Sequence, residues 1–149
     1  MSLFVLTVLV ASAVASGAPD AGSDRSAIES LISEFNSATA VSDFNRLLAL
    51  FAKNGDYGVG GAVPIAAGTA IRQAPRKKFP WDERMPLAIK VQKIQFIGPD
   101  VALADAIQSD SSPMIGDSRN WSCTFVLVRV GRDWKIASYR EFLITTRSR

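Results

Sequence analysis

The chain has 149 residues, 17 of them basic and 14 acidic, with one cysteine and no histidine. That length fits one domain, and 48% apolar with 21% charged residues exclude a disordered tail, a collagen-like chain or a coiled coil. Without histidine, Ser-His-Asp and Cys-His catalysis and His-ligated zinc or haem sites are excluded. A single cysteine excludes an internal disulfide and a cysteine cluster, so we expect no metal and no cofactor.

The N-terminus resembles a secretory signal peptide over residues 1–15, which carry no charge. An apolar run from Leu3 to Val10 is followed by Ala13-Val14-Ala15, which favours cleavage after Ala15, or alternatively after Gly17. The run is shorter than the about 20 apolar residues that span a bilayer. We therefore expect a secreted or periplasmic protein without stable membrane insertion. No Lys or Arg precedes the run, and a buried N-terminal strand is the competing interpretation.

The net charge of +3 is too small to indicate a nucleic-acid partner. The one basic cluster, Arg76-Lys77-Lys78, lies between Pro75 and Pro80 and has no interleaved aromatic residues. That composition favours a solvated loop. Residues 146–149 form a basic tail that we expect to be a frayed terminus.

Two amphipathic helices are predicted after a small polar spacer over residues 16–23. The first is capped by Asp24 or Ser23, and the second is capped by Ser42 and ends at Asn54-Gly55. Each carries one apolar stripe with i, i+3, i+4, i+7 spacing: Ile28, Leu31, Ile32 and Phe35 in the first, and Phe44, Leu47, Leu48 and Phe51 in the second.

From Asp56 onward the apolar period changes to two, which indicates strands. A short hairpin turning at Gly60-Gly61 and a short helix over residues 68–74 come first. Four longer strands follow, over residues 87–97, 101–108, 121–130 and 134–145. A change of parity near Gln92-Lys93 predicts a bulge that bends the sheet. The result is an α+β fold, with three N-terminal helices covering one face of a curved antiparallel sheet.

This order of elements resembles the nuclear transport factor 2-like superfamily, and more narrowly its SnoaL-like and SgcJ/EcaC-type domains, over residues 24–145. The segments that carry the resemblance are Asp43, Leu47–Ala52, Gly55–Tyr57, Gly68–Ile71, Gly98–Leu103 and Phe125–Ile136. The resemblance implies a cone-shaped, cystatin-like fold with a pocket between helices and sheet, and a homodimer formed through the sheet. It implies no single activity, because the superfamily includes isomerases, cyclases, dehydratases, and transport and association modules.

This chain lacks the catalytic residues of two reaction mechanisms known in the superfamily. Its steroid isomerases use a carboxylate base, a tyrosine and a protonated aspartate. By the resemblance, those positions fall on Val59, on Phe35 and near Val126, and all three are apolar. Its SnoaL-type cyclases and scytalone-type dehydratases rely on His-Asp pairs, and this chain has no histidine. Neither mechanism is expected in this protein.

The candidate site consists of residues expected to face the interior of the cone. Asp105 lies in the middle of an apolar strand, where desolvation would raise the pKa of its carboxyl, although a wet strand edge or a partner such as Arg129 is the competing interpretation. Asp105 and Tyr57 are the catalytic candidates. The expected ligand-binding residues, which could alternatively be ordinary core and rim, are Phe35, Tyr57, Val59, Trp81, Trp121 and Tyr139. Cys123 is expected to be a buried, inert thiol.

Three functions remain open: binding of a small apolar ligand in the cone, proton-transfer catalysis by an inward carboxylate with Tyr57, and association without a ligand. An inward carboxylate within hydrogen-bond reach of a hydroxyl would favour the enzyme. An apolar lining would favour binding, and a filled cone would favour association. We rank binding first, because the catalytic residues of the related folds are missing.

A homodimer is expected because the strand over residues 121–130 is apolar on both faces. Cys123, Phe125 and Leu127 have one parity, and Val126, Val128 and Val130 have the other. An antiparallel sheet with one face in water should alternate apolar and polar residues. The helices can cover only one face of the sheet, so a second copy of the chain is expected to cover the other.

Overall fold

The computed structural model describes residues 21–73, 88–111 and 118–144. The signal segment, the basic cluster at 76–78, Trp81 and the tail at 146–149 lie outside these ranges. The elements follow in the order α1 (Ala21–Ala40), α2 (Phe44–Ala49), β1 (Phe51–Val59), β2 (Ile65–Ala66), α3 (Ala67–Gln73), β3 (Ala88–Gly98), β4 (Val101–Ser111), β5 (Ser118–Val130) and β6 (Asp133–Leu143). The first helix begins at Ala21, three residues before the predicted domain boundary. None of the described helices is long and apolar enough to cross a membrane.

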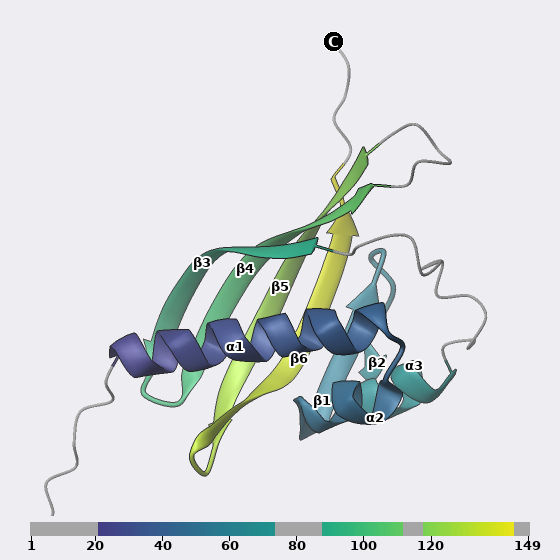
Figure 1. Ribbon diagram of the computed structural model, residues 1–149. Coiled ribbons are helices and arrows are strands. Elements are labelled where there is room, and N and C mark those ends of the chain that lie inside the picture. The colour runs from purple at the N-terminus through teal and green to yellow at the C-terminus, as the bar shows by residue number, and fades with distance from the viewer. Residues whose placement is uncertain (1–20, 74–87, 112–117, 145–149) are drawn as a thin grey trace, which may run out of the picture.

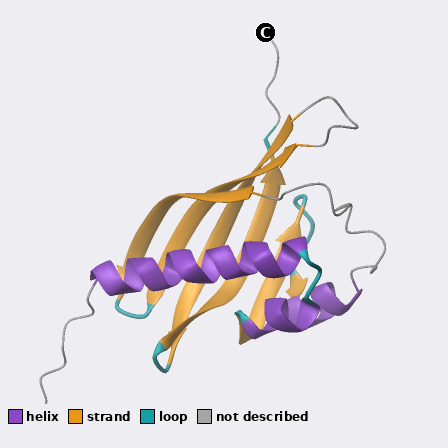
Figure 2. Cartoon of the chain, in the orientation of Figure 1, coloured by secondary structure: helices purple, strands orange, loops and turns teal. Residues whose placement is uncertain are grey.

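Six strands form one curved sheet in the order β2-β1-β6-β5-β4-β3, and α1 crosses its concave face (Figures 1 and 2). The helices α2 and α3 pack against β1. The long strands pair antiparallel as predicted, whereas β1 runs parallel to β6, with Tyr57 opposite Tyr139. This confirms the α+β architecture and adds one parallel pair, which brings the strand after α2 beside the last strand of the chain.

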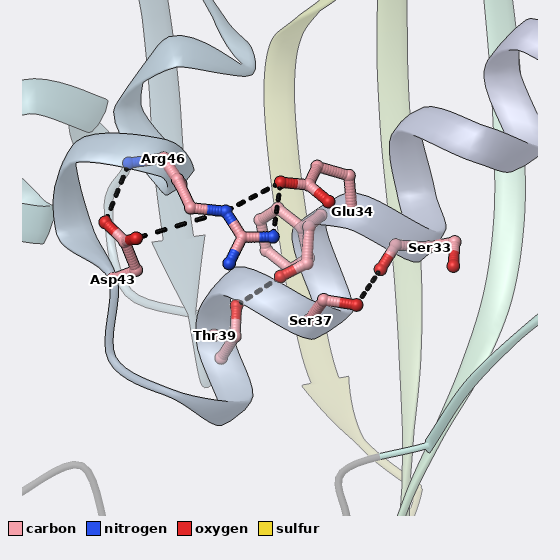
Figure 3. Close-up of polar contacts among 7 residues, drawn as sticks. Ser33, Glu34, Ser37, Thr39, Asp43 and Arg46 are labelled. Carbon is pink, nitrogen blue, oxygen red and sulfur yellow. Dashed lines mark hydrogen bonds and ion pairs between the residues drawn. The ribbon is translucent and has the colours of Figure 1, made fainter.

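The turn between α1 and α2 is held by polar side chains, shown in Figure 3. Asp43, rather than the expected Ser42, is the N-cap of α2, and its carboxylate accepts a hydrogen bond from Arg46 N at 3.0 Å. Ser42 makes the turn itself, with a left-handed φ of 55°. Arg46 also reaches back to Glu34 of α1, with 2.6 Å between Nη2 and Oε1. Both side chains of this ion pair are nearly half exposed, so it contributes only about 0–1 kcal/mol to stability.

The second helix is shorter than its apolar spacing predicts. It ends at Ala49, and Phe51 opens β1 because Ile136 N donates a hydrogen bond to Leu50 O at 2.9 Å, which pulls this backbone into the sheet. Gly55, expected to terminate the helix, lies within β1. A Cβ atom at this position would lie 2.8 Å from Ile136 O, so the close approach of the two strands requires glycine.

The predicted bulge is confirmed in β3, and its neighbour β4 keeps a regular register. Val91 pairs with Ala106 and Lys93 pairs with Asp105, so Gln92 is the extra residue. The alternate residues of β4 that face the helices are small and fully buried: Ala102, Ala104 and Ala106. The bend and this row of small side chains shape the interior of the cone at its β3 side.

An ion pair of low exposure ties the N-terminal turn of α1 to the sheet. The Asp24 carboxylate accepts hydrogen bonds from Arg129 Nη2 and from Trp134 Nε1, the latter at 3.2 Å. Arg129 also contacts Asp100 in the β3–β4 turn, and its guanidinium lies 4.5 Å from the centre of the Trp134 ring. The Arg129 guanidinium holds the pKa of Asp24 below its usual range. One contact set therefore links α1, β5, β6 and the β3–β4 turn.

Candidate functional site

A second bulge, in β6, decides which side chains of this strand enter the cone. Val126 of β5 pairs with Ser138, and Leu127 pairs with Ile136, which leaves Ala137 as the extra residue. Ile136 faces the core before the bulge, and Tyr139 does so after it. Without the extra residue, strand alternation would direct Tyr139 to the outer face.

Tyr139 and Glu141 form a buried phenol–carboxyl pair on this strand. Their side chains are 1% and 5% exposed, and Tyr139 Oη donates a hydrogen bond to Glu141 Oε2 at 2.9 Å. Burial raises the pKa of Glu141, and the hydrogen bond from Tyr139 opposes this rise. Burial and the negative charge of Glu141 together raise the pKa of Tyr139 well above its usual value. The pair therefore holds a proton in a desolvated setting.

Gln108 lies beside this pair on β4, and Trp121 is its cross-strand partner on β5. Gln108 is 2% exposed, and its Oε1 lies 3.5 Å from Tyr139 Oη. Gln108 Nε2 and Trp121 Nε1 are both buried and have no hydrogen-bond partner among the residues that the structure describes. We call Gln108, Trp121, Tyr139 and Glu141 the polar cluster.

Aromatic rings line the interior next to the polar cluster. Tyr57 stacks on Tyr139 with 5.0 Å between ring centroids, and Phe35 lies 5.0 Å from the same ring. Phe125 lies 4.9 Å from Tyr139 and meets Phe35 edge to face at 5.3 Å. Burial raises the pKa of Tyr57 above its usual value. The cluster thus borders an apolar, aromatic floor.

The structure brings together three of the six residues expected to bind a ligand, namely Phe35, Tyr57 and Tyr139. Trp121 packs partly buried against the core on the next strand. Val59 is 39% exposed at the end of β1, and Trp81 lies outside the described residues. These placements centre the candidate site on Tyr139.

Asp105 does not point into the cone. It is exposed on the outer face of the sheet, where Thr124 Oγ1 donates a hydrogen bond to its carboxylate at 3.0 Å. The reason is strand parity, because its neighbours Ala104 and Ala106 occupy the inward positions. Arg129 is not its partner either, since its guanidinium contacts Asp24 and Asp100.

The inward carboxylate is Glu141, which the sequence analysis missed. Next to Arg140 it resembles a solvated surface charge, but it shares the parity of Tyr139, which was already expected to face inward. That shared parity was the available signal. Cys123 is buried as expected, with Sγ 3.4 Å from Tyr139 Oη, and burial raises the pKa of its thiol to about 11.

No group of three or more Cys, Asp or Glu side chains within residues 21–73, 88–111 and 118–144 could hold a metal ion. The polar groups of the site can supply the following chemistry. Glu141 can accept or return a proton, Tyr139 can hold the carboxylate in place, and the Gln108 and Trp121 nitrogens can donate hydrogen bonds.

Comparisons with known proteins agree with this architecture. A family model described as a SnoaL-like domain matches residues 28–141. No match is found among the curated proteins. A solved domain of unknown function with a cystatin-like fold, from Nostoc punctiforme PCC 73102, superposes with a TM-score of 0.70 and 16% identity, covering 84% of this chain and 80% of that one.

Two solved structures with stated roles have similar folds. The CaMKII hub of S. rosetta gives a TM-score of 0.68 at 16% identity, covering 80% of this chain and 95% of that one. A hexachlorocyclohexane dehydrochlorinase gives 0.66 at 15% identity, covering 83% and 86%. Likeness at these identities concerns the fold, and it confirms the predicted cystatin-like, nuclear transport factor 2-like cone.

Proposed function

Because the chain belongs to the SnoaL-like domain family, with residues 28–141 matching the family model, we propose that it binds a small, largely apolar molecule beside its polar cluster. The observation that carries this proposal is the buried Tyr139–Glu141 pair next to an aromatic floor. Small-molecule sites combine mostly apolar walls with a few placed polar groups, and this end of the cone has that composition.

The energetics of burial support a ligand over simple core packing. A buried polar group without a hydrogen bond costs about 1–3 kcal/mol, so a protein with no use for it gains stability by replacing it with an apolar residue. This interior holds Gln108 and Glu141 among Phe and Ala side chains. A bound molecule would give these groups a role that core packing does not require.

A panel of neutral aromatic and alicyclic hydrocarbons, screened by saturation-transfer NMR on the purified protein, tests the binding function. We expect saturable, one-to-one binding of at least one probe. Glu141→Gln should strengthen that binding, because the variant removes a charge from the site. Glu34→Gln, which removes an exposed carboxylate from α1, should leave it unchanged. Absence of saturable binding across the panel, or equal affinities in both variants, would contradict the proposal.

A second function, proton-transfer catalysis, is favoured by the 2.9 Å contact between Tyr139 and Glu141. Glu141 would take a proton from a bound molecule and return it, while Tyr139 holds the carboxylate. The shared fold of a dehydrochlorinase supports this alternative. Catalysed exchange of solvent deuterium into a bound probe, lost in Glu141→Gln while binding persists, would establish it. Binding with no exchange in the native chain would reject it.

We also propose that two copies associate through the outer face of the sheet. Leu103 and Val126 are cross-strand partners on that face, and both are only half-buried in the single chain. Val128 and Ile107 flank them on the same face with similar exposure. A second copy related by a twofold axis would bury these side chains. A hub domain shares the fold, which supports a role in assembly.

Export is the remaining proposal, and it rests on the apolar run before Ala15. N-terminal sequencing of the exported protein should begin at Ser16, or at Ala18 for the alternative cleavage. Recovery of the chain from the cytosol with Met1 and the apolar run intact would contradict export.

A further inference from the structure

Two unsatisfied hydrogen-bond donors meet at the same level of the sheet. Gln108 and Trp121 are directly opposed on β4 and β5, and both side chains lie on the helix-covered face. Gln108 is 2% exposed. Neither Gln108 Nε2 nor Trp121 Nε1 has a hydrogen-bond partner within the described residues.

The chemistry of these two nitrogens specifies what can satisfy them. An indole N–H and an amide N–H₂ only donate, so their common partner must be an acceptor. The Glu141 carboxylate of the cluster accepts the Tyr139 hydroxyl and pairs with neither nitrogen. A ligand oxygen over Gln108 and Trp121 on the helix-covered face would pair with both donors, while its apolar part lies beside the aromatic floor.

The neighbouring carboxyl excludes ligands that carry a negative charge. Glu141 is 5% exposed and belongs to the same cluster, so a ligand carboxylate or phosphate would face it across a medium that screens charge poorly. Burial already raises the pKa of Glu141, and a second anion would raise it further. A neutral acceptor carries no such cost.

We propose that the ligand of the cone carries a neutral carbonyl group, which accepts hydrogen bonds from Gln108 Nε2 and Trp121 Nε1. This inference rests on the proposed binding function and names the chemical class of the ligand. Gln108 and Trp121 would then select for the carbonyl, and the aromatic floor would bind the apolar part of the molecule.

Three probes of matched shape test the inference by calorimetry on the full chain: 2-acetylnaphthalene, 2-isopropylnaphthalene and 2-naphthoate. We expect the ketone to bind about 10-fold more tightly than the hydrocarbon, as one to two buried hydrogen bonds would provide. The carboxylate should bind more weakly than the ketone. Gln108→Met removes one donor at a similar side-chain volume, and Trp121→Phe removes the other donor and keeps an aromatic ring. Each should weaken ketone binding about 5- to 10-fold and leave hydrocarbon binding unchanged.

Gln95→Met is the matched control. Gln95 is exposed on β3, so this substitution makes the same chemical change outside the cone. It should bind all three probes as the native chain does. Gln108→Met should melt no lower than the native chain, since it removes a buried amide whose nitrogen has no partner in the described residues and whose oxygen has only a long contact, so a loss of ketone binding would not reflect unfolding.

Three outcomes separate this inference from the proposal on which it rests. Equal affinities for ketone and hydrocarbon would overturn the carbonyl inference and leave the binding function standing. Tighter binding of 2-naphthoate than of the ketone would overturn it as well. If neither the ketone, the hydrocarbon nor any probe of the hydrocarbon panel binds, the binding function itself fails.

Discussion

Burial keeps both tyrosine hydroxyls of the chain protonated, because Tyr57 and Tyr139 are its only tyrosines and the pKa of each is raised. We expect the folded protein to show no tyrosinate absorbance at pH about 10, where tyrosines of the unfolded chain are about half ionised. An absorbance titration of the native chain, beside the same chain in guanidinium, measures this. Half-ionisation of the native chain near pH 10 would show that the phenols are solvated.

Glu141 should lower stability at neutral pH. Burial raises the pKa of its carboxyl in the folded state above the unfolded value, so the folded chain binds this proton more tightly. The contribution of Glu141 to stability is therefore complete below the pKa that its carboxyl has in the unfolded chain. This contribution is lost as the pH rises through the pKa of Glu141 in the folded chain. Glu141→Gln should melt a few degrees higher at pH 7, and the difference should close near pH 4, about the unfolded value.

Thermal melts across this pH range test the Glu141 prediction, with Glu34→Gln as the control. Glu34 lies in an exposed ion pair with Arg46, so its replacement should change stability by only about 0–1 kcal/mol. A Glu141→Gln variant that melts lower than the native chain at neutral pH would show that the ionised carboxyl stabilises the fold.

Single residues of the site were partly predictable from the sequence. Tyr57 was proposed as an interior candidate from its parity with Val59, and Tyr139 from its aromatic character, and their rings stack in the interior. Asp105 was assigned to the wrong face of the sheet. The sequence does not show which face a mid-strand carboxylate occupies until the inward residues of β4 are known to be Ala104 and Ala106. Glu141 was missed because a charge beside Arg140 resembles surface, although its parity matched that of Tyr139.

At the level of elements, the contacts of Asp24 should hold the first turn of α1 on the sheet. The pKa of this carboxyl is lowered by Arg129, so its contribution to stability is present above the unfolded pKa and is lost as pH falls through the folded pKa. Asp24→Asn should therefore lower the melting temperature at neutral pH, and the difference from the native chain should shrink in acid. Hydrogen exchange at the start of α1 should accelerate.

The same Glu34→Gln variant is the control for Asp24, because both residues lie on α1 and both contact an arginine. Of these two contacts, that of Asp24 joins the helix to the sheet at low exposure, whereas that of Glu34 reaches Arg46 of α2. Equal melting temperatures for Asp24→Asn and the native chain would show that the Asp24 contacts do not hold α1 on the sheet.

Helices and strands were predictable where the spacing of their apolar residues fitted one period only. The apolar stripe of α1, the four long strands and the bulge at Gln92 followed from spacing alone. The end of α2 did not, because Phe51 continues the helical spacing and a pairing with Ile136, distant in sequence, decides its conformation. The bulge at Ala137 is defined by the pairing of β6 with β5, which the spacing within β6 did not reveal.

At the scale of the whole molecule, the outer face of the sheet should hold two copies together. Val126→Glu places a charge at the centre of that face beside Leu103, and a buried unpaired charge is costly. We expect the native chain to be a dimer and this variant a folded monomer in light scattering. Val63→Glu, at a site 85% exposed outside the sheet, should remain a dimer. A monomeric native chain, or a dimeric Val126→Glu variant, would contradict this interface.

The central claim is that a small molecule binds beside Tyr139, and NMR of the chain labelled with ¹³C at the tyrosine ring tests it most directly. Only Tyr57 and Tyr139 contribute tyrosine ring signals, and the Tyr57→Phe variant assigns them by removing the signal of Tyr57. During titration with a hydrocarbon probe that binds, the Tyr139 signal should shift to saturation with the same dissociation constant as the binding itself. Saturable binding that leaves both tyrosine signals unmoved would place the ligand elsewhere and contradict the site described above.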